Sequence, residues 1–189
     1  MYDEMTKSAS RMNVKMLALT GLMAAVICIL GPLSFSIPIS PVPFSLGTLA
    51  IYFAVSVLGM KRGALSVIIY ILLGLAGLPV FSGFGSGAGK LLGPTGGYII
   101  GYLFMAVVCG HFADKFSKSP PIFFLGMALG TIVCYLFGTF WLALQSSMSF
   151  SAALWAGVIP FIPGDIVKLI LAGALGLQLK GRLKRAGLI

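Results

Sequence analysis

Long apolar runs, each ended by charged residues or by proline and glycine, are the feature that most constrains this chain of 189 residues. A helix needs roughly 20 apolar residues to cross the hydrocarbon core of a bilayer. Hydrophobic residues make up 59% of the chain and charged residues only 9%, too few for the surface of a soluble domain. The runs predict an all-α integral membrane protein in which a bundle of six transmembrane helices forms one transmembrane domain over residues 1–189. The predicted helices cover residues 14–30, 44–60, 64–81, 96–113, 121–144 and 164–179.

The connecting segments are also informative. Residues 37–43 are rich in proline, residues 82–90 are rich in glycine, and residues 152–159 form an apolar piece that is too short to span. The first run follows basic residues, as in a signal peptide, but no small-x-small cleavage site comes after it, so we expect a retained helix. No segment is left over for a water-soluble catalytic or nucleotide-binding domain.

The basic residues are distributed very unevenly along the chain. Eleven of the 13 Lys and Arg residues flank alternate ends of the predicted helices, on one side of the membrane: Lys7, Arg11, Lys15, Lys61, Arg62, Lys115, Lys118, Lys180, Arg182, Lys184 and Arg185. Basic residues of this kind stay on the cytoplasmic side, so both termini are predicted to be cytoplasmic. The net charge of +9 therefore indicates membrane topology, and no nucleic acid is expected as a partner.

Three ionisable residues fall on the opposite, outer side: Lys90, Asp165 and Lys168. A charge at membrane depth is costly, which makes it a candidate functional residue. Asp165 and Lys168 are three residues apart, in the first turn of the last helix, and therefore share a face. One interpretation is a structural ion pair. The other is a ligand site, which Lys90 completes from the glycine-rich loop acting as an outer lid.

Several other classes of site are excluded by the sequence. The three cysteines lie inside apolar runs without metal or redox spacing, and the single histidine, His111, offers no metal site, so no metal is expected. The glycine-rich loop fails the phosphate-loop pattern because Phe84 and Leu91 occupy required glycine and hydroxyl positions. No Ser/His/Asp set, HExxH motif or carboxylate pair is present, so we expect neither an enzyme nor a bound cofactor.

Two further patterns are left open by the sequence. Tyr98 opens the fourth helix at the outer mouth, where it is either an interfacial aromatic residue or a wall of the site with a polar tip. Ala18, Gly21 and Ala25 form a stripe of small residues on the first helix. Such a stripe permits close helix approach, either within this chain or with another subunit.

Three stretches resemble a known family: residues 74–81 (GLAGLPVF), 93–98 (GPTGGY) and 160–168 (PFIPGDIVK). They are similar to the BioY family, the biotin-specific S components of energy-coupling-factor (ECF) vitamin transporters. The resemblance extends from the first helix to the carboxyl-terminal tail, and the last two stretches are the most specific.

The resemblance implies a high-affinity biotin receptor in a bacterial cell membrane. In that family the S component docks on a transmembrane coupling subunit that carries two ATPase subunits, and the stripe at Ala18, Gly21 and Ala25 is the expected contact.

Biotin carries a ureido ring, an apolar thioether ring and a carboxylate. Ionised Asp165 can accept from the ureido N–H and Lys168 can donate to the ureido oxygen. Lys90 is expected to meet the carboxylate, and Phe44, Phe84 and Tyr98 are expected to wall the apolar ring.

Other functions compete with this interpretation. A stand-alone secondary carrier for a small carboxylate-bearing solute would suit a chain with interrupted, duplicated helices, and residues 37–41 and 159–163 are weakly alike. A purely structural subunit would leave the three outer charges without a role.

Overall fold

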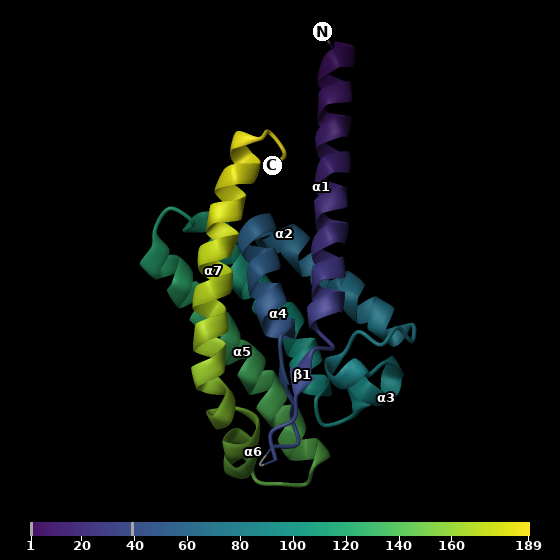
Figure 1. Ribbon diagram of the computed structural model, residues 1–189, viewed down its shortest axis with the longest axis vertical. Helices are drawn as coiled ribbons and strands as arrows, with labels where there is room; N and C mark the ends of the chain where they lie inside the picture. Colours follow the sequence, from purple (N-terminus) through teal and green to yellow (C-terminus); the bar gives the residue numbers. More distant parts are fainter. Residues whose placement is uncertain (1, 39) are drawn as a thin grey trace.

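The computed structural model describes residues 2–38 and 40–189, with side chains placed from residue 14 onward, and it is a bundle of helices (Figure 1). The main helices are α1 (Tyr2–Leu30), α2 (Gly47–Leu75), α4 (Gly96–Lys115), α5 (Pro120–Gln145) and α7 (Ile162–Arg185). Shorter elements lie between them: β1 (Ser34–Phe35), β2 (Phe44–Ser45), η1 (Ser82–Phe84), α3 (Gly87–Leu92), α6 (Phe150–Gly157) and η2 (Ile159–Phe161). α1 and α7 pack against α2, α2 packs against α4, and α4 packs against α5.

The six predicted helices are confirmed, although one continuous element contains two of them. α2, α4, α5 and the segment Phe150–Arg185 are long and apolar enough to cross a membrane, and Val14–Leu30 is a shorter apolar helix. α2 reverses direction at Gly59, so that Gly63 lies directly against Val55. Its two arms correspond to the second and third predicted helices.

The reversal in α2 depends on Gly59, whose φ of +76° belongs to the left-handed region that favours glycine. A Cβ at this position would also overlap the carboxylate of Asp114 at the end of α4. The N–H of Met60 donates to Oδ2 of Asp114 at 2.9 Å, which satisfies a free donor at the start of the second arm. The chain therefore turns within one residue, where the sequence predicted a connection at residues 61–63.

Two predicted ends of this helix pair were wrong. Phe44, the predicted start of a helix, lies in β2, which pairs antiparallel with β1 and places Phe44 opposite Phe35. The third helix ends at Leu75 and not at residue 81, because Gly77 has a φ of +103° and Pro79 follows. Phe81 turns back into the core, where its ring packs edge-on against Tyr70 with the ring centres 5.4 Å apart.

The other predicted helices agree in position with the structure but are longer in it, and α1 begins at Tyr2, twelve residues before the predicted start at residue 14. α4 and α5 are each extended by up to two residues, α7 begins two residues early, and α7 continues to Arg185. The apolar piece predicted at residues 152–159 is α6, which continues through η2 into α7. The glycine-rich stretch is partly ordered as η1 and α3 beside the end of α1 (Figure 1).

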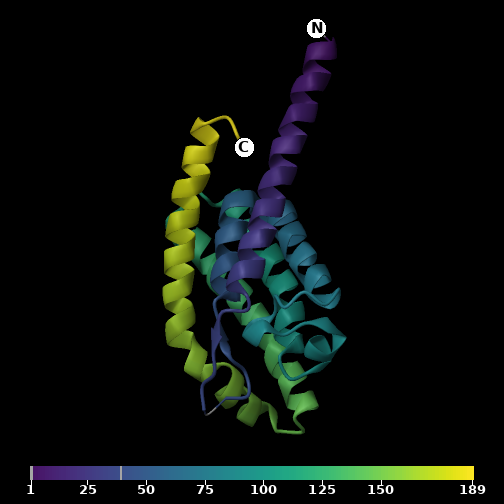
Figure 2. The same cartoon turned by 45° about the vertical axis from the view of Figure 1, so that its right-hand side comes forward.

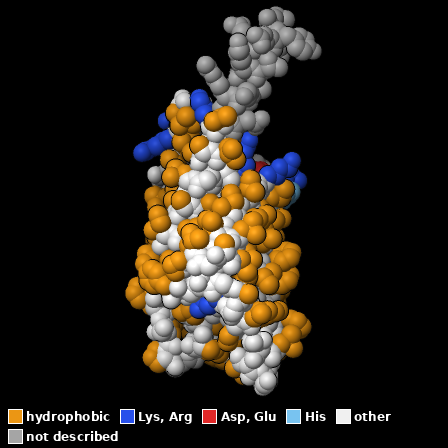
Figure 3. Space-filling view, turned by 90° about the vertical axis from the view of Figure 1, so that its right-hand side faces the viewer, with side chains coloured by type: hydrophobic (Ala, Val, Ile, Leu, Met, Phe, Trp, Pro, Cys, Tyr) orange, Lys and Arg blue, Asp and Glu red, His pale blue; other side chains and the backbone are white. Residues whose placement is uncertain are grey.

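α1 begins and α7 ends at the same end of the bundle, while α3 and α6 lie toward the opposite end (Figure 2). Lys and Arg side chains gather around the first of these ends, and the side of the molecule in view is covered largely by hydrophobic side chains (Figure 3). Large hydrophobic residues on three helices, such as Leu72, Leu125 and Leu175, are exposed. An apolar belt with basic residues at one end fits a bilayer.

Candidate ligand-binding site

A buried ion pair begins α7. Pro163 lies in the first turn of the helix, where a proline costs no hydrogen bond, and Asp165 and Lys168 follow on one face. Oδ1 of Asp165 is 2.8 Å from Nζ of Lys168, and the two residues are only 7% and 5% exposed. The three-residue spacing predicted this contact, and α7 therefore presents both charges toward the interior of the bundle.

The ammonium of Lys168 is surrounded by four partners. Besides Asp165, Nζ donates to the carbonyl oxygen of Ser45 at 2.6 Å and to Oγ1 of Thr48 at 3.2 Å. It also lies 3.4 Å from the centre of the Phe44 ring, which is a cation–π contact. An ammonium has three hydrogens to donate, so none is free for a further acceptor in this arrangement.

The carboxylate of Asp165 has spare capacity. Its Oδ1 accepts from Lys168 and, at 3.5 Å, from Thr48, while its Oδ2 accepts the hydroxyl of Tyr135 at 2.6 Å. Each carboxylate oxygen can accept about two hydrogen bonds. Oδ2 therefore retains one position for an additional donor.

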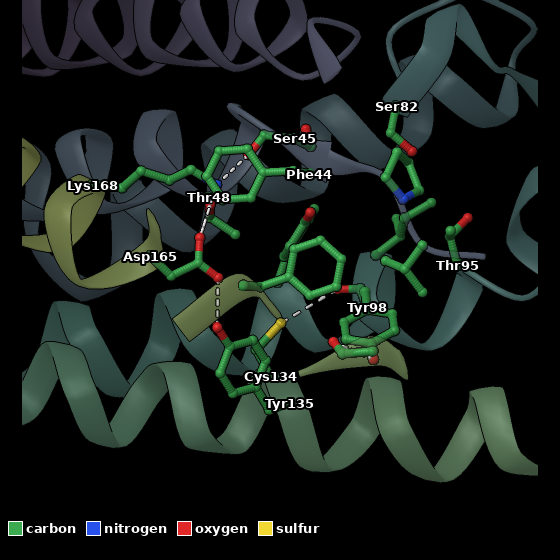
Figure 4. Close-up of a pocket in the computed structure, with 16 residues that line it drawn as sticks. Phe44, Ser45, Thr48, Ser82, Thr95, Tyr98, Cys134, Tyr135, Asp165 and Lys168 are labelled. Atoms are coloured by element: carbon green, nitrogen blue, oxygen red, sulfur yellow. Dashed lines mark hydrogen bonds and ion pairs between the residues drawn. The ribbon is translucent and has the colours of Figure 1, made fainter. Parts of the chain in front are cut away.

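These groups line one end of a cavity of about 50 Å³ between α2, α4, α5 and α7 (Figure 4). Ser82 and Thr95 lie at the other end of it, and Tyr98 lies between the two ends (Figure 4). The complete lining comprises Val42, Pro43, Phe44, Ser45, Thr48, Ser82, Thr95, Tyr98, Ile99, Tyr102, Cys134, Tyr135, Gly157, Phe161, Asp165 and Lys168. Aromatic walls and a few converging polar groups are typical of a small-molecule site, but such sites usually enclose roughly 300–1,000 Å³, so a ligand must widen this cavity to enter it.

Aromatic residues give this cavity its walls. Phe44 stacks on Phe161 with the ring centres 6.1 Å apart and the planes at 6°. Tyr98 is 7% exposed, and its hydroxyl donates to the carbonyl oxygen of Gly157 at 2.9 Å. Tyr98 is thus buried beside the cavity and does not lie on the outer surface of the bundle, while its role as a wall of a ligand site stays a prediction.

Comparison with known proteins places this chain in a family. The model of the BioY family matches residues 5–185. This chain belongs to the BioY family. The biotin transporter BioY of Rhizobium etli is 36% identical over 174 residues, which are 87% of this chain and 92% of that protein. Its counterpart in Thermotoga maritima is 40% identical over 145 residues, 77% of this chain and 85% of that protein.

A solved structure is similar over nearly the whole chain. It is the crystal structure at 2.1 Å of the S-component for biotin from an ECF-type ABC transporter. It matches with a TM-score of 0.83 and 36% identity, over 89% of this chain and 92% of that one. The six-helix bundle is therefore the fold of an S component, and this BioY-family chain is a multi-pass membrane protein.

The structure brings four of the six predicted site residues together. Asp165, Lys168, Tyr98 and Phe44 line the cavity. Lys90 and Phe84 are absent from the described lining. Lys90 lies in α3, half-buried, with its aliphatic chain packed over Gly85. Phe84 is 63% exposed, with an unusual φ of +57°. A ligand contact at either residue stays a prediction.

Several lining residues of this BioY-family chain were not predicted. Tyr135 and Thr48, which bind the charged pair, lie inside apolar helices far from it in sequence. A polar group within an apolar span is a usable signal, but it does not reveal which side of the helix faces the site.

The predicted partner contact lies on the surface of this chain. Ala18, Gly21 and Ala25 are exposed along α1, and a Cβ at Gly21 would meet no atom within 4 Å. The stripe therefore packs against no other part of the chain that the structure describes. Docking of another subunit there stays a prediction.

Proposed function

We propose that this chain is a high-affinity membrane receptor for biotin and the substrate-binding S component of an ATP-driven ECF importer. Its role is binding, not catalysis, and ATP is hydrolysed by separate subunits. The observation that carries the proposal is the cavity, in which a buried carboxylate with a free acceptor position faces aromatic walls. Membership of the BioY family and similarity to an S-component for biotin support the choice of ligand.

The chemistry of biotin matches the polar end of the cavity. The ureido ring carries two N–H donors and one carbonyl oxygen. A ureido N–H donates to Oδ2 of Asp165, which has the open position beside Tyr135. Lys168 donates to the ureido oxygen, and for this it must release one of its present partners. Charge-assisted bonds of this kind are roughly twice as strong as neutral ones.

The remainder of the ligand occupies the aromatic and loop side of the site. Phe44 and Tyr98 form the walls beside the thioether ring. Ser82 lines the cavity and belongs to η1, so this segment already reaches the site. Lys90 meets the carboxylate of biotin when η1 and α3 close over the opening, and Phe84 moves inward with them.

The surface of the bundle indicates where this chain contacts its partner subunits. The exposed stripe at Ala18, Gly21 and Ala25 is the contact for the transmembrane coupling subunit, which carries the two ATPase subunits. Both termini lie in the cytoplasm, since Lys and Arg side chains gather at the end of the bundle where α1 begins and α7 finishes (Figures 2 and 3). The membrane is the plasma membrane of a bacterium.

The direct test is to identify the small molecule that copurifies with the detergent-solubilised protein. We expect biotin, released on denaturation in an amount close to one molecule per chain. A protein that carries none and also fails to bind added biotin would disprove the proposal.

A further inference from the structure

Two hydroxyl groups lie at the end of the cavity away from Asp165. They belong to Ser82 in η1 and to Thr95, the residue that precedes α4 (Figure 4). Thr95 is only 7% exposed, and its hydroxyl forms no hydrogen bond with any residue that the structure describes. Buried polar groups are normally paired. Because Thr95 lines the cavity, its hydroxyl is available to a ligand there.

The start of α4 adds backbone donors beside this hydroxyl. In the described part of the chain, the N–H groups of Thr95 and Gly97 donate to no oxygen. The first turn of α4 also carries no acidic residue. The start of a helix of 20 residues carries a partial positive charge, and its free N–H groups favour an anion.

The chain around Thr95 is held in place by α5. The ring N–H of Trp141 donates to the carbonyl oxygen of Gly93 at 2.9 Å, and the N–H of Gly96 donates to the same oxygen at 3.0 Å. A Cβ at Gly97 would overlap the side chain of Trp141, so α4 begins in direct contact with α5. Thr95 is therefore in position before a ligand binds, which lowers the cost of binding.

The charges assigned to the outer side of the membrane also favour an anion. Asp165 and Lys168 neutralise each other in their ion pair. Lys90 is the third and last charged residue that the sequence assigns to this side, and it leaves one positive charge uncompensated. A ligand with a single carboxylate would balance this charge.

We propose that Thr95, Ser82 and the start of α4 bind the carboxylate of the ligand whose ureido ring is held by Asp165. This inference rests on the proposed function and adds the second polar end of the same site. Biotin carries its ureido ring and its carboxylate at opposite ends, as the cavity carries Asp165 and Thr95 (Figure 4). Lys90 then covers the carboxylate from α3. The site thereby selects ligands that carry an anionic tail.

Thr95→Val tests this inference, because it removes the hydroxyl at nearly constant volume. Calorimetric titration compares biotin with an analogue that carries a methyl group in place of the carboxylate. Loss of a hydrogen bond to a charged group should weaken biotin binding at least about 10-fold. The methyl analogue should bind Thr95→Val at least as tightly as it binds the wild type, because it accepts no hydrogen bond. Thr95→Ser keeps the hydroxyl and should bind biotin nearly as the wild type does.

Thr20→Val is the matched control. Thr20 is also buried, but its hydroxyl donates within its own helix, to the carbonyl oxygen of Met16 at 2.7 Å, and it lies outside the cavity lining. This control should change neither affinity. Ser82→Ala, which leaves α4 intact, should show the same selective loss of biotin affinity as Thr95→Val.

The outcomes separate this inference from the proposed function. In Thr95→Val, an equal loss of affinity for both ligands, or no loss for either, would overturn the carboxylate site. A wild-type protein that binds biotin no more tightly than the methyl analogue would overturn it as well. Failure of the wild type to bind either ligand would instead contradict the proposed function itself.

Discussion

At the scale of single residues, the ring of Phe44 covers one side of the Lys168 ammonium. It also stacks on Phe161 and rests on Gly164, where no side chain separates it from α7. Asp165 and Thr48 belong to the helices α7 and α2, whereas Phe44 and Ser45 form the two-residue strand β2, from which only Phe44 presents a side chain to Lys168. We therefore expect the ring to be the partner that a ligand displaces.

Replacing Gly164 by Ala tests this expectation. The new Cβ overlaps the Phe44 ring, and overpacking of this kind costs typically about 1–3 kcal/mol. The ligand-free protein should therefore melt at a lower temperature than the wild type. If biotin displaces the ring, the strain is relieved in the complex, so biotin should raise the melting temperature of Gly164→Ala more than that of the wild type.

Gly181→Ala is the matched control on the same helix, because a Cβ there meets nothing within 4 Å. It should not lower the melting temperature, since alanine is the better helix former. A smaller biotin-induced shift in Gly164→Ala than in the wild type would contradict the displacement of Phe44.

A site residue could be predicted from the sequence when its residue type is rare in the segment that contains it. Asp165 and Lys168 were predicted because charges are rare in apolar helices, and their spacing implied the pair. Tyr135 could not be selected in the same way, because its partner lies 30 residues away in sequence and only the packing of α5 against α7 joins them. Lys90 was predicted to reach the site because its glycine-rich loop lies on the outer side of the membrane. The path of that loop, however, depends on tertiary packing.

At the scale of elements, the lengths of the apolar runs predicted which segments are helical, but they predicted the helix ends less well. Helix ends depend on one or two backbone angles, such as those of Gly59 and Gly77, and glycine permits but does not require them. The partner that fixes the turn at Gly59 is Asp114, which lies 54 residues beyond Met60, and so no local pattern reveals it.

The segment of η1 and α3 is the element for which we predict a change on ligand binding. Trypsin should cleave after Lys90 in the ligand-free protein in detergent. Biotin at about 100 times its dissociation constant stabilises the bound state by about 2.7 kcal/mol, and closure of the segment should then strongly slow this cleavage. Lys118, exposed in the connection between α4 and α5, is the internal control and should be cut at an unchanged rate. Equal cleavage at Lys90 with and without biotin would show that this segment is not a lid.

At the scale of the whole molecule, the even number of spans and the basic residues at one end predict the orientation. In a chain whose native cysteines have been replaced, Ser86→Cys should react with an impermeant thiol reagent added outside intact cells. Ser117→Cys should react only after the membrane is opened. The opposite labelling pattern would reverse the proposed topology.

Dependence on partner subunits separates an S component from a stand-alone carrier. Membrane vesicles that contain this chain alone should bind biotin without accumulating it. Accumulation should require the coupling subunit, both ATPase subunits and ATP. Concentrative uptake by the chain alone would favour the secondary carrier.

The central claim is that the cavity at the start of α7 binds biotin through Asp165, and calorimetric titration of Asp165→Asn tests it most directly. The substitution keeps the shape but removes the charge that accepts the ureido N–H. A charge-assisted hydrogen bond contributes about 1.5–3 kcal/mol, so affinity should fall at least about 10-fold. Asp114→Asn, which makes the same change at the opposite end of the bundle, should bind biotin as the wild type does. Wild-type affinity in monodisperse Asp165→Asn, with only a lower melting temperature, would instead mean that Asp165 and Lys168 form a purely structural pair.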